Sequence, residues 1–313
     1  MGRSVLVMGE ALVDRITTDD GNSTDVLGGG PFNAARVLGR LGAKTWFLGA
    51  VSTDASGERI WNALRECGVH AAVGERSSRP TGIAFARVQA GGSATYEFAL
   101  DDSACADLTA GQALTALRAA GQVAVAHVGT LAFVLRPLRE AAAAVLGAIE
   151  PTVLCFIDAN CRPALVLDFA EYKSTLERAF ARADVIKLST EDATFLWPSM
   201  EPLAAARQLH HDCGAVVLLT DGERGVTALG RGFEEHLAAP VVEVADTVGA
   251  GDAFGAGFIA RWLQAGHARG AVTDASAVVD ACRVGMAVAA WTVQHVGAAT
   301  PTWQDIPGDW MLD

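Results

Sequence analysis

Short apolar runs recur along the chain and give the clearest structural pattern in the sequence. Most are bounded by Gly, Asp, Ser or Asn and alternate with longer segments rich in Ala and Leu. Runs that are apolar throughout are typical of strands buried on both faces of a sheet. Six runs have this character: Val5–Met8, Thr45–Val51, Val123–Val128, Val153–Ile157, Val185–Leu188 and Val216–Thr220. Joined by helices they form βαβ units, so the sequence predicts an α/β fold with a doubly wound, mostly parallel sheet flanked by helices.

Two segments depart from this pattern. Residues 79–100 alternate between apolar and polar positions around the Gly91-Gly92 pair, which is typical of half-exposed antiparallel strands. Residues 13–26 are polar and rich in turn-forming residues. We predict that these two segments together form a small β-sheet lid over the site. The predicted main α/β domain comprises residues 1–12, 27–78 and 101–313.

Composition and charge narrow the class of protein. The chain has 313 residues, of which 51% are hydrophobic and 19% charged, as is typical of a globular protein. Its formal net charge of −12 disfavours general binding to nucleic acid or to an anionic membrane surface. The six cysteines include no C-x-x-C pair, and the N-terminal segment lacks the pattern of a signal peptide. We therefore expect reduced thiols, no nucleic-acid or membrane partner, and a cytoplasmic location.

Residues 246–258, DTVGAGDAFGAGF, combine small residues with carboxylates. The preceding run Val241–Val244 predicts a strand. Aromatic residues at four-residue spacing after the motif predict a helix that ends near Gly266. Asp252 then falls in the first turn of that helix. The small residues at the strand-to-helix turn are Gly249, Ala250 and Gly251.

This turn has the properties of an anion site beside a base. Small residues let backbone N–H groups converge on a bound anion, and a helix N-terminus adds a favourable potential. Phosphoryl transfer needs such a cradle because negative charge spreads over the transferring oxygens. The carboxylate of Asp252 can accept the proton of an attacking hydroxyl. The alternative is that Asp252 is only an ordinary charge at a helix N-terminus.

Two separated segments resemble the signatures of a known family. DTVGAGDAF at 246–254 is similar to the C-terminal signature of the ribokinase-like (PfkB) family of carbohydrate kinases, and residues 28–57 are similar to its N-terminal signature. The resemblance implies a ribokinase-like fold with a β-sheet lid, and an ATP-dependent sugar kinase that uses Mg²⁺. It also implies that Asp252 is the catalytic base beside the small residues of its turn. The sequence contains no G-x-x-x-x-G-K-[ST] or H-R-D segment, which disfavours a P-loop or protein-kinase assignment.

The resemblance places the acceptor sugar against three segments. One follows the first predicted strand, one is a Gly run at a helix start, and one is DANCRP at 158–163. The implied sugar-binding residues are Asp14, Gly28, Gly29, Gly30, Asn33, Asn160 and Arg162, with Asp158 facing the same site. Carboxylate and amide groups suit the recognition of hydroxyls. Asn33 is also compatible with an ordinary helix start, and Arg162 with a surface salt bridge.

The resemblance also assigns residues to the nucleotide and to two metal ions. Segments KLSTED at 187–192 and TDGERG at 220–225 each include or follow the end of a predicted strand. The implied nucleotide contacts are Lys187, Ser189, Thr220, Gly222 and Gly251. Glu191 and Asp192 are implied for Mg²⁺, acting through water because this ion usually keeps several waters. A K⁺ ion is implied near Asp246, Val248, Thr292, His295 and Gly297, mainly on backbone oxygens.

Three segments indicate the subtype. GEALVD at 9–14, HVGTLAF at 127–133 and DANCRP at 158–163 resemble fructokinases, and the last also resembles 2-keto-3-deoxygluconate kinases. Fructokinase is therefore the leading interpretation, with a 2-keto-3-deoxygluconate kinase and then a ribokinase or nucleoside kinase as alternatives. A regulator that binds sugar or nucleotide without turnover is the alternative from another class, although it has no need of a base. The lid is a candidate surface for a homodimer.

Overall fold

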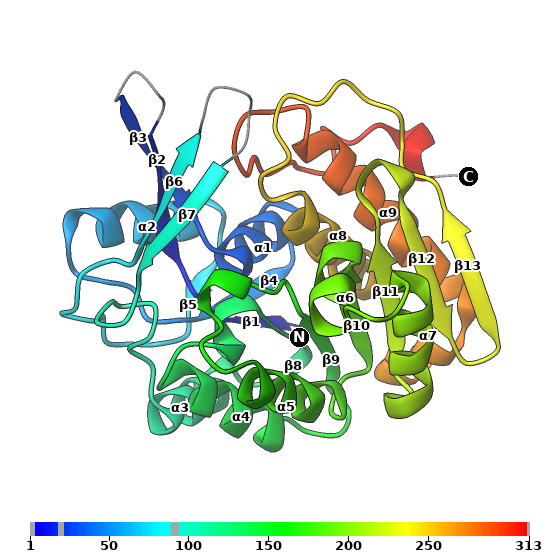
Figure 1. The fold of residues 1–313 in the computed structure, drawn as a ribbon, viewed down its shortest axis with the longest axis horizontal. Coiled ribbons are helices and arrows are strands. Elements are labelled where there is room, and N and C mark those ends of the chain that lie inside the picture. Colours follow the sequence, from blue (N-terminus) through cyan, green and yellow to red (C-terminus); the bar gives the residue numbers. More distant parts are fainter. Residues whose placement is uncertain (1–3, 18–21, 89–93, 312–313) are drawn as a thin grey trace.

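A nine-stranded sheet forms the centre of the computed structural model, which describes residues 4–17, 22–88 and 94–311. Its strands lie in the order β13-β12-β11-β10-β9-β8-β1-β4-β5 (Figure 1). They are β1 Ser4–Met8, β4 Lys44–Leu48, β5 His70–Ala71, β8 Val123–Gly129, β9 Leu154–Asp158, β10 Val185–Ser189, β11 Val216–Thr220, β12 Val226–Gly230 and β13 Phe233–Leu237. Neighbours from β5 to β11 are parallel, and β12 and β13 extend the sheet in antiparallel pairs. The predicted sheet is confirmed, and each of the six apolar runs forms one of its strands.

The strand order creates a topological switch point at β1. The chain passes from β1 to β4 and β5 on one side, then continues on the other side through β8, β9, β10 and β11. In open α/β sheets, ligands bind at the carboxyl ends of the strands beside such a point. The registers pair Gly129 with Asp158 and Ser189 with Thr220, so the last residues of four strands share one edge. The sheet alone therefore directs attention to this edge.

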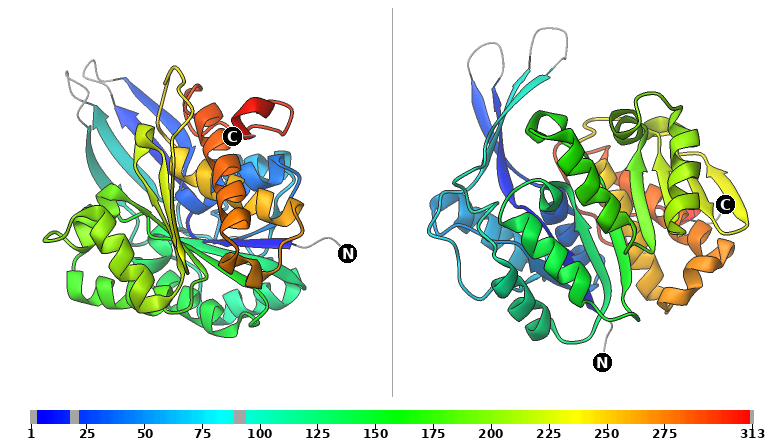
Figure 2. Two further views of the ribbon diagram at one scale, coloured as in Figure 1. Left: turned by 90° about the vertical axis from the view of Figure 1, so that its right-hand side faces the viewer. Right: turned by 60° about the horizontal axis from the view of Figure 1, so that its bottom comes forward.

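Helices cover both faces of the sheet, and each face has its own hydrophobic core (Figure 2). One layer contains α3 Ala110–Ala120, α4 Leu138–Ala148, α5 Phe169–Phe180, α6 Thr190–Leu196 and α7 Pro202–Cys213. The other contains α1 Gly30–Arg40, α2 Ala55–Glu66, α8 Ala250–Gln264 and α9 Ala275–Thr292. Within β1, Leu6 and Met8 pack in the first core while Val5 and Val7 pack in the second. Because both faces are covered, the inner strands are largely apolar, whereas the edge strand β13 is polar and exposed.

Short 3₁₀ helices and helix caps complete the connections. The 3₁₀ helices are η1 Thr130–Phe133, η2 Pro163–Leu165, η3 Gly222–Arg224, η4 Arg269–Thr273 and η5 Gly308–Met311. The predicted helix after the small-residue motif is α8, with Asp252 in its first turn. Gly266 lies just beyond its end with a φ of 75°, as a C-terminal glycine does.

The predicted strand Val241–Val244 is wrong. These residues form an irregular segment, and Val241 is fully exposed. The segment leaves the sheet after β13, so its β-branched residues have no neighbouring strand with which to pair. Instead, the N–H groups of Ala245 and Asp246 both donate to the carbonyl of Val293, at 2.8 and 3.1 Å. The turn that leads into α8 is therefore held by the end of α9 rather than by the sheet.

A second sheet, which has four strands among the described residues, projects from the main body (Figure 1). In the order β3-β2-β6-β7, its strands are Ser23–Gly28, Leu12–Thr17, Ile83–Val88 and Ala94–Ala99. β2 pairs with β6 in parallel, whereas the other neighbours are antiparallel. The predicted small sheet is confirmed, with β2 and β3 extending slightly beyond the predicted 13–26 segment. The predicted Gly91-Gly92 turn lies outside the described residues, and the function of the sheet as a lid stays a prediction.

No helix in the described parts of the chain combines the length and the apolar character that crossing a bilayer requires.

Candidate active site

The turn into α8 requires glycine at position 249 and leaves little room for a side chain at position 251. Gly249 has a φ of 78°, and a Cβ added there would lie 2.7 Å from the Cβ of Ala298. A Cβ on Gly251 would lie 3.1 Å from Nζ of Lys187. No side chain caps the start of α8, so its first backbone N–H groups have no side-chain acceptor. A free helix start beside an ammonium group is suited to binding an anion.

Asp252 is a buried carboxylate in the first turn of α8. Its Oδ2 accepts a hydrogen bond of 3.0 Å from Nδ2 of Asn33 in α1. Burial raises the pKa of Asp252 to about 6, and the charge of Asp158 raises it further, while Asn33, Lys187 and Arg162 oppose the rise. The carboxylate is thus ionised at neutral pH and is a stronger base than an ordinary aspartate.

Three polar side-chain atoms from different elements converge on Gly30 at the start of α1. A Cβ built on Gly30 would lie 2.7 Å from Oγ1 of Thr130, 2.9 Å from Nδ2 of Asn160 and 3.0 Å from Oδ1 of Asp252. Asn160 also donates a 3.0 Å hydrogen bond to Oγ1 of Thr130. Because glycine has no side chain, these donors and acceptors can lie close together at the start of α1. Such a group of polar atoms can bind a hydroxyl, which donates one hydrogen bond and accepts another.

Thr130 and Asn160 both have strained backbones. Their φ values are 55° and 33°, a region that non-glycine residues adopt rarely and that is least favourable for a β-branched residue. Thr130 follows β8 and Asn160 follows β9, two neighbouring parallel strands. Strain of this kind costs about 1–3 kcal/mol per residue and is concentrated at functional sites.

Asp14 in β2 approaches the Gly run from the small sheet. It is half-buried, and burial raises its pKa to about 6 against the opposing charge of Arg162. A Cβ on Gly28 would overlap the carboxylate of Asp14. Gly29 has a φ of 108°, and a Cβ there would lie 2.7 Å from the carbonyl oxygen of Glu10. Glycine at both positions therefore allows β2 and β3 to approach closely.

Arg162 supplies positive charge to a group of acidic side chains. Its side chain is exposed and donates to the carbonyl of Cys161 at 3.2 Å. Its charge lowers the pKa values of Asp14 and Asp252, which burial has raised. The Arg162 side chain forms no salt bridge among the described residues, and its predicted role toward the sugar stays a prediction.

A buried ion pair lies beneath the start of α8. Nζ of Lys187 in β10 is 3.0 Å from each carboxylate oxygen of Asp158 at the end of β9. Burial alone would lower the pKa of Lys187, but the charges of Asp158 and Asp192 outweigh burial and raise it. A charged ammonium is therefore held next to Gly251 without reaching solvent.

The residues predicted for the nucleotide lie along the same edge of the sheet. Ser189 and Thr220 are paired at the ends of β10 and β11, and Gly222 begins η3 with a φ of 51°. Ser189 is also the N-cap of α6, where its hydroxyl accepts from the N–H of Asp192 at 3.0 Å. The structure thus places Ser189, Thr220 and Gly222 near one another, but the Ser189 hydroxyl already has a hydrogen-bond partner within its own helix.

The two acidic residues predicted for Mg²⁺ differ in their surroundings. Asp192 is buried, and its carboxylate accepts from the N–H groups of Cys161 at 2.7 Å and Ser189 at 3.0 Å. Glu191 is exposed. Among the residues that the structure describes, no group of three or more His, Cys, Asp or Glu side chains is arranged to hold a metal ion.

The two segments predicted for K⁺ are joined through Asp246. Its carboxylate accepts from the N–H of Val248 at 3.0 Å and from the N–H of Gly297 at 2.8 Å. Thr292 is buried at the end of α9, and its hydroxyl donates to the carbonyl of Val288 at 3.0 Å. His295 stacks on Trp291. The structure therefore brings 246–248 and 292–297 together.

Sequence reasoning did not single out Glu10 or Thr130. Glu10 is 1% exposed, and its carboxylate accepts from the N–H groups of Gly30 and Leu131 at 3.0 and 3.1 Å. Both residues follow apolar runs within segments, GEALVD and HVGTLAF, that were used only for the subtype. A search for every polar residue just after a buried strand would have found them.

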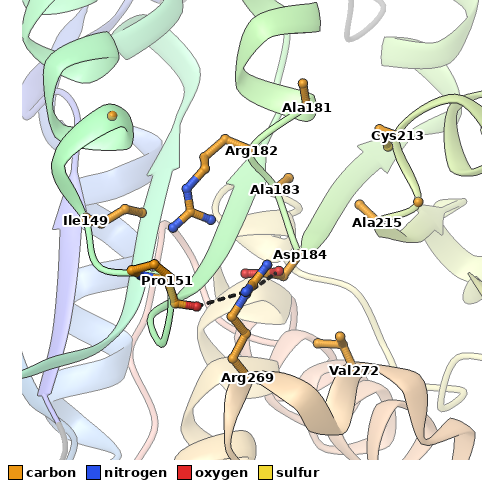
Figure 3. Close-up of a pocket in the computed structure, with 12 residues that line it drawn as sticks. Ile149, Pro151, Ala181, Arg182, Ala183, Asp184, Cys213, Ala215, Arg269 and Val272 are labelled. Atoms are coloured by element: carbon orange, nitrogen blue, oxygen red, sulfur yellow. Dashed lines mark hydrogen bonds and ion pairs between the residues drawn. The ribbon is translucent and has the colours of Figure 1, made fainter.

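A separate pocket of about 540 Å³ opens at the amino ends of β10 and β11 (Figure 3). Arg269 enters it and donates to Oδ1 of Asp184 at 2.7 Å and to the carbonyl of Pro151 at 2.8 Å. Arg182 donates to the carbonyl of Glu150 at 3.4 Å. The C-terminal ends of α4, α5 and α7 line the pocket, and helix C-termini repel anions. Its arginines stabilise the fold there, and none of the predicted site residues lines it.

Comparison with known proteins agrees with this geometry. The family model for pfkB family carbohydrate kinase matches residues 3–305. Fructokinases from Rhizobium leguminosarum bv. trifolii and Salmonella typhimurium are 31% and 30% identical to this chain. The matches span 264 and 307 residues, covering 82% and 96% of this chain and 78% and 96% of the relatives. A crystal structure of fructokinase with bound ATP from Xylella fastidiosa aligns with a TM-score of 0.88 at 25% identity, over 97% of both chains.

Proposed function

Because the chain belongs to the pfkB family of carbohydrate kinases, we propose that it transfers the γ-phosphate of ATP to a hydroxyl of D-fructose. It has the ribokinase-like fold, and as a carbohydrate kinase it is a phosphotransferase with a sugar hydroxyl as acceptor. Fructose as the acceptor is supported by the fructokinase relatives and by the polar character of the sugar side.

The observation that carries the proposal is the group of polar side-chain atoms around Gly30. Hydrogen-bonding atoms of Thr130 and Asn160 lie there together with Oδ1 of Asp252, whose Oδ2 accepts a hydrogen bond from Asn33. A hydroxyl placed there meets both groups that orient it and the group that removes its proton. Holding a reactant in this way supplies much of the rate enhancement in phosphoryl transfer.

Asp252 accepts the proton of the sugar hydroxyl in the proposed reaction. The hydroxyl oxygen forms a bond to the γ-phosphorus as the bond from that phosphorus to the oxygen of departing ADP breaks. The N–H groups at the start of α8 and the ammonium of Lys187 stabilise the charge on the transferring group. Asn33 keeps the carboxylate of Asp252 oriented throughout.

A neutral polyhydroxyl acceptor suits the charge balance of the site better than a keto-acid does. Asp14 and Asp252 already have pKa values raised by burial, and Arg162 partly offsets their charge. Lys187 is paired with Asp158. A 2-keto-3-deoxygluconate carboxylate would add negative charge and compete for Arg162, at a cost that grows as water is excluded.

The acceptor is tested by measuring ADP release at saturating MgATP with D-fructose, 2-keto-3-deoxygluconate, D-ribose and a nucleoside. We expect the highest kcat/KM for D-fructose. A clear preference for the keto-acid would refute D-fructose as the acceptor but would leave the assignment as a kinase in place. Absence of ADP release with every acceptor, while ATP still binds, would favour a regulator without turnover.

Mg²⁺ and K⁺ form the second part of the proposal. The carboxylate of Asp192 already accepts two backbone hydrogen bonds, and Glu191 is exposed, so these residues fit an ion held chiefly by nucleotide phosphates and water. Mg²⁺ would supply neutralisation of phosphate charge. The K⁺ proposal is supported by the way the carboxylate of Asp246 joins its own turn to Gly297, which holds the two segments predicted for this ion next to each other.

Exchange of Na⁺ for K⁺ is expected to raise kcat if this cation site exists. An ordered cation would stabilise the turn before α8 and hence the position of its N–H groups. The measurement compares rates in NaCl and KCl at one ionic strength. Asp246→Asn is the variant that weakens the hydrogen bonds between the carboxylate of Asp246 and the N–H groups of Val248 and Gly297. Equal rates in both salts would remove K⁺ from the proposal.

The pH dependence of kcat/KM for the sugar is expected to follow the raised pKa values of the site. Asp252 acts as a base only when ionised, and its folded pKa is about 6 rather than about 4. Activity should therefore fall as pH decreases through about 6. Because Asp14 titrates in the same range and the pKa of buried Glu10 is raised to about 7, the decline should begin near pH 7 and exceed tenfold per pH unit below pH 6. A profile that stays flat down to pH 5 would contradict this assignment.

The small sheet is also our proposed dimer interface. It presents β3 and β7 as its two edges, and exposed edges are ready to pair with another chain. Light scattering tests the oligomeric state, and a monomer at assay concentration would refute the dimer.

A cytoplasmic location is proposed from the six unpaired thiols, with cell fractionation as the test.

A further inference from the structure

The carboxylate of Glu10 joins two parts of the sugar side that are far apart in the sequence. Glu10 follows β1 directly, at the switch point of the sheet. Its Oε1 accepts from the N–H of Gly30 at 3.0 Å, and its Oε2 accepts from the N–H of Leu131 at 3.1 Å. One side chain therefore ties the start of α1 to η1. Neither proton transfer nor sugar binding accounts for it.

Both ends of this bridge carry atoms of the acceptor site. Gly30 is the residue on which Thr130, Asn160 and Asp252 converge. The N–H of Leu131 belongs to the peptide that follows Thr130, whose φ of 55° is unfavourable for a β-branched residue. A hydrogen bond to that peptide helps to hold the strained turn, and with it the Thr130 hydroxyl.

A buried carboxylate is a costly way to join two loops. Glu10 is almost fully buried, and burial raises its pKa to about 7 even though three backbone N–H groups and Arg162 favour its charge. An apolar residue of similar size would avoid this cost but would leave two backbone N–H groups without an acceptor. A single group that accepts from both segments also fixes the distance between them.

We propose that Glu10 is a positioning residue that sets the separation between Gly30 and Thr130, and so shapes the acceptor site. The identity of the acceptor rests on the proposed function, whereas the bridge itself does not. Glu10→Gln keeps the size of the side chain but turns one acceptor into an N–H donor that faces a backbone N–H. One of the two bonds is then lost, and the two segments separate.

Steady-state kinetics of Glu10→Gln at pH 8, where the raised pKa of about 7 still leaves Glu10 of the parent mostly ionised, test this directly. We expect kcat/KM for the sugar to fall about 10- to 100-fold, as small misplacements in active sites do, with the KM for ATP unchanged within about twofold. Asp184→Asn is the matched control. Asp184 is also a buried carboxylate that accepts from a backbone N–H, that of Cys155 at 2.8 Å, but it lies at the opposite edge of the sheet. The control should lose stability and keep its KM for the sugar.

Amide hydrogen exchange provides a measurement that does not depend on turnover. In Glu10→Gln, the N–H groups of Gly30 and Leu131 should exchange about tenfold faster than in the parent, while that of Cys155 should not change. This comparison remains decisive even if the parent phosphorylates no sugar, so it separates failure of the bridge from failure of the proposed function.

Glu10→Asp replaces Glu10→Gln if the latter does not fold. The aspartate retains the charge but is one methylene too short to span both segments, so it should give the same kinetic pattern.

Three results would overturn the positioning role. The first is an unchanged kcat/KM together with unchanged amide exchange in folded Glu10→Gln. The second is an equal rise in the sugar KM for Asp184→Asn. The third is failure of both Glu10 variants to fold, which would make Glu10 a residue of the fold alone.

Discussion

Replacement of Asp252 by Asn is expected to lower kcat by about 10²- to 10⁴-fold, the usual effect of removing a general base. The amide keeps the size of the side chain and can still accept from Asn33, so the geometry of the site is retained. Binding of ATP should change little. Rapid-quench or coupled assays of kcat, together with a binding isotherm for ATP, measure both quantities.

The stability of this variant separates catalysis from folding. Burial raises the pKa of Asp252 from its ordinary value to about 6, so the charge destabilises the fold increasingly as pH rises from about 4 to 6. At pH 7 to 8 the neutral amide avoids that cost, and the variant should melt no lower than the parent. Glu171→Gln, which removes an exposed first-turn acid of α5 that also pairs with Arg136 and Arg139, is the control for loss of a charge at a helix N-terminus and should keep full activity. Near-normal turnover of Asp252→Asn would refute the base.

Gly30→Ala should reduce kcat/KM for the sugar by about 10²-fold while leaving the protein folded. The added Cβ would lie within 3.0 Å of side-chain atoms of Thr130, Asn160 and Asp252, so these side chains must shift to make room for it. Gly30 has an ordinary helical backbone, so alanine causes no strain there. The substitution therefore displaces the polar atoms of the site selectively.

Gly111→Ala is the matched control for this prediction. Gly111 also lies at the start of a helix, α3, but a Cβ there meets no atom within 4 Å. Gly111→Ala should melt at or slightly above the temperature of the parent, because alanine favours helix over glycine, whereas Gly30→Ala should melt lower because its Cβ crowds buried side chains. Retention of full kcat/KM in Gly30→Ala would show that the polar atoms around Gly30 do not hold the acceptor.

The sequence was sufficient for those features that depend on local patterns. Apolar runs predicted six strands, because residues covered on both faces leave no polar alternation. The small residues before Asp252 predicted the start of α8, since few other sequences permit a left-handed turn at Gly249. Val241–Val244 shows the limit of the same reasoning, because a β-branched run becomes a strand only where a neighbour is available.

The convergence over Gly30 could not be read from one sequence. It depends on β1, β8 and β9 ending side by side, so that Glu10 reaches Leu131 across 121 positions. Thr130 carries no local signal for its left-handed backbone. The local role of Asp192 was, by contrast, within reach, because Ser189 followed three residues later by an acid is the pattern of a capping box.

The most direct test of the central claim follows the phosphorus itself. Incubation of the protein with ATP, Mg²⁺ and D-fructose is monitored by ³¹P NMR, with Asp252→Asn run in parallel. The account predicts a phosphomonoester signal that grows in step with ADP in the parent and is nearly absent in the variant. Formation of ADP with inorganic phosphate alone, or a phosphomonoester formed equally well by the variant, would contradict it.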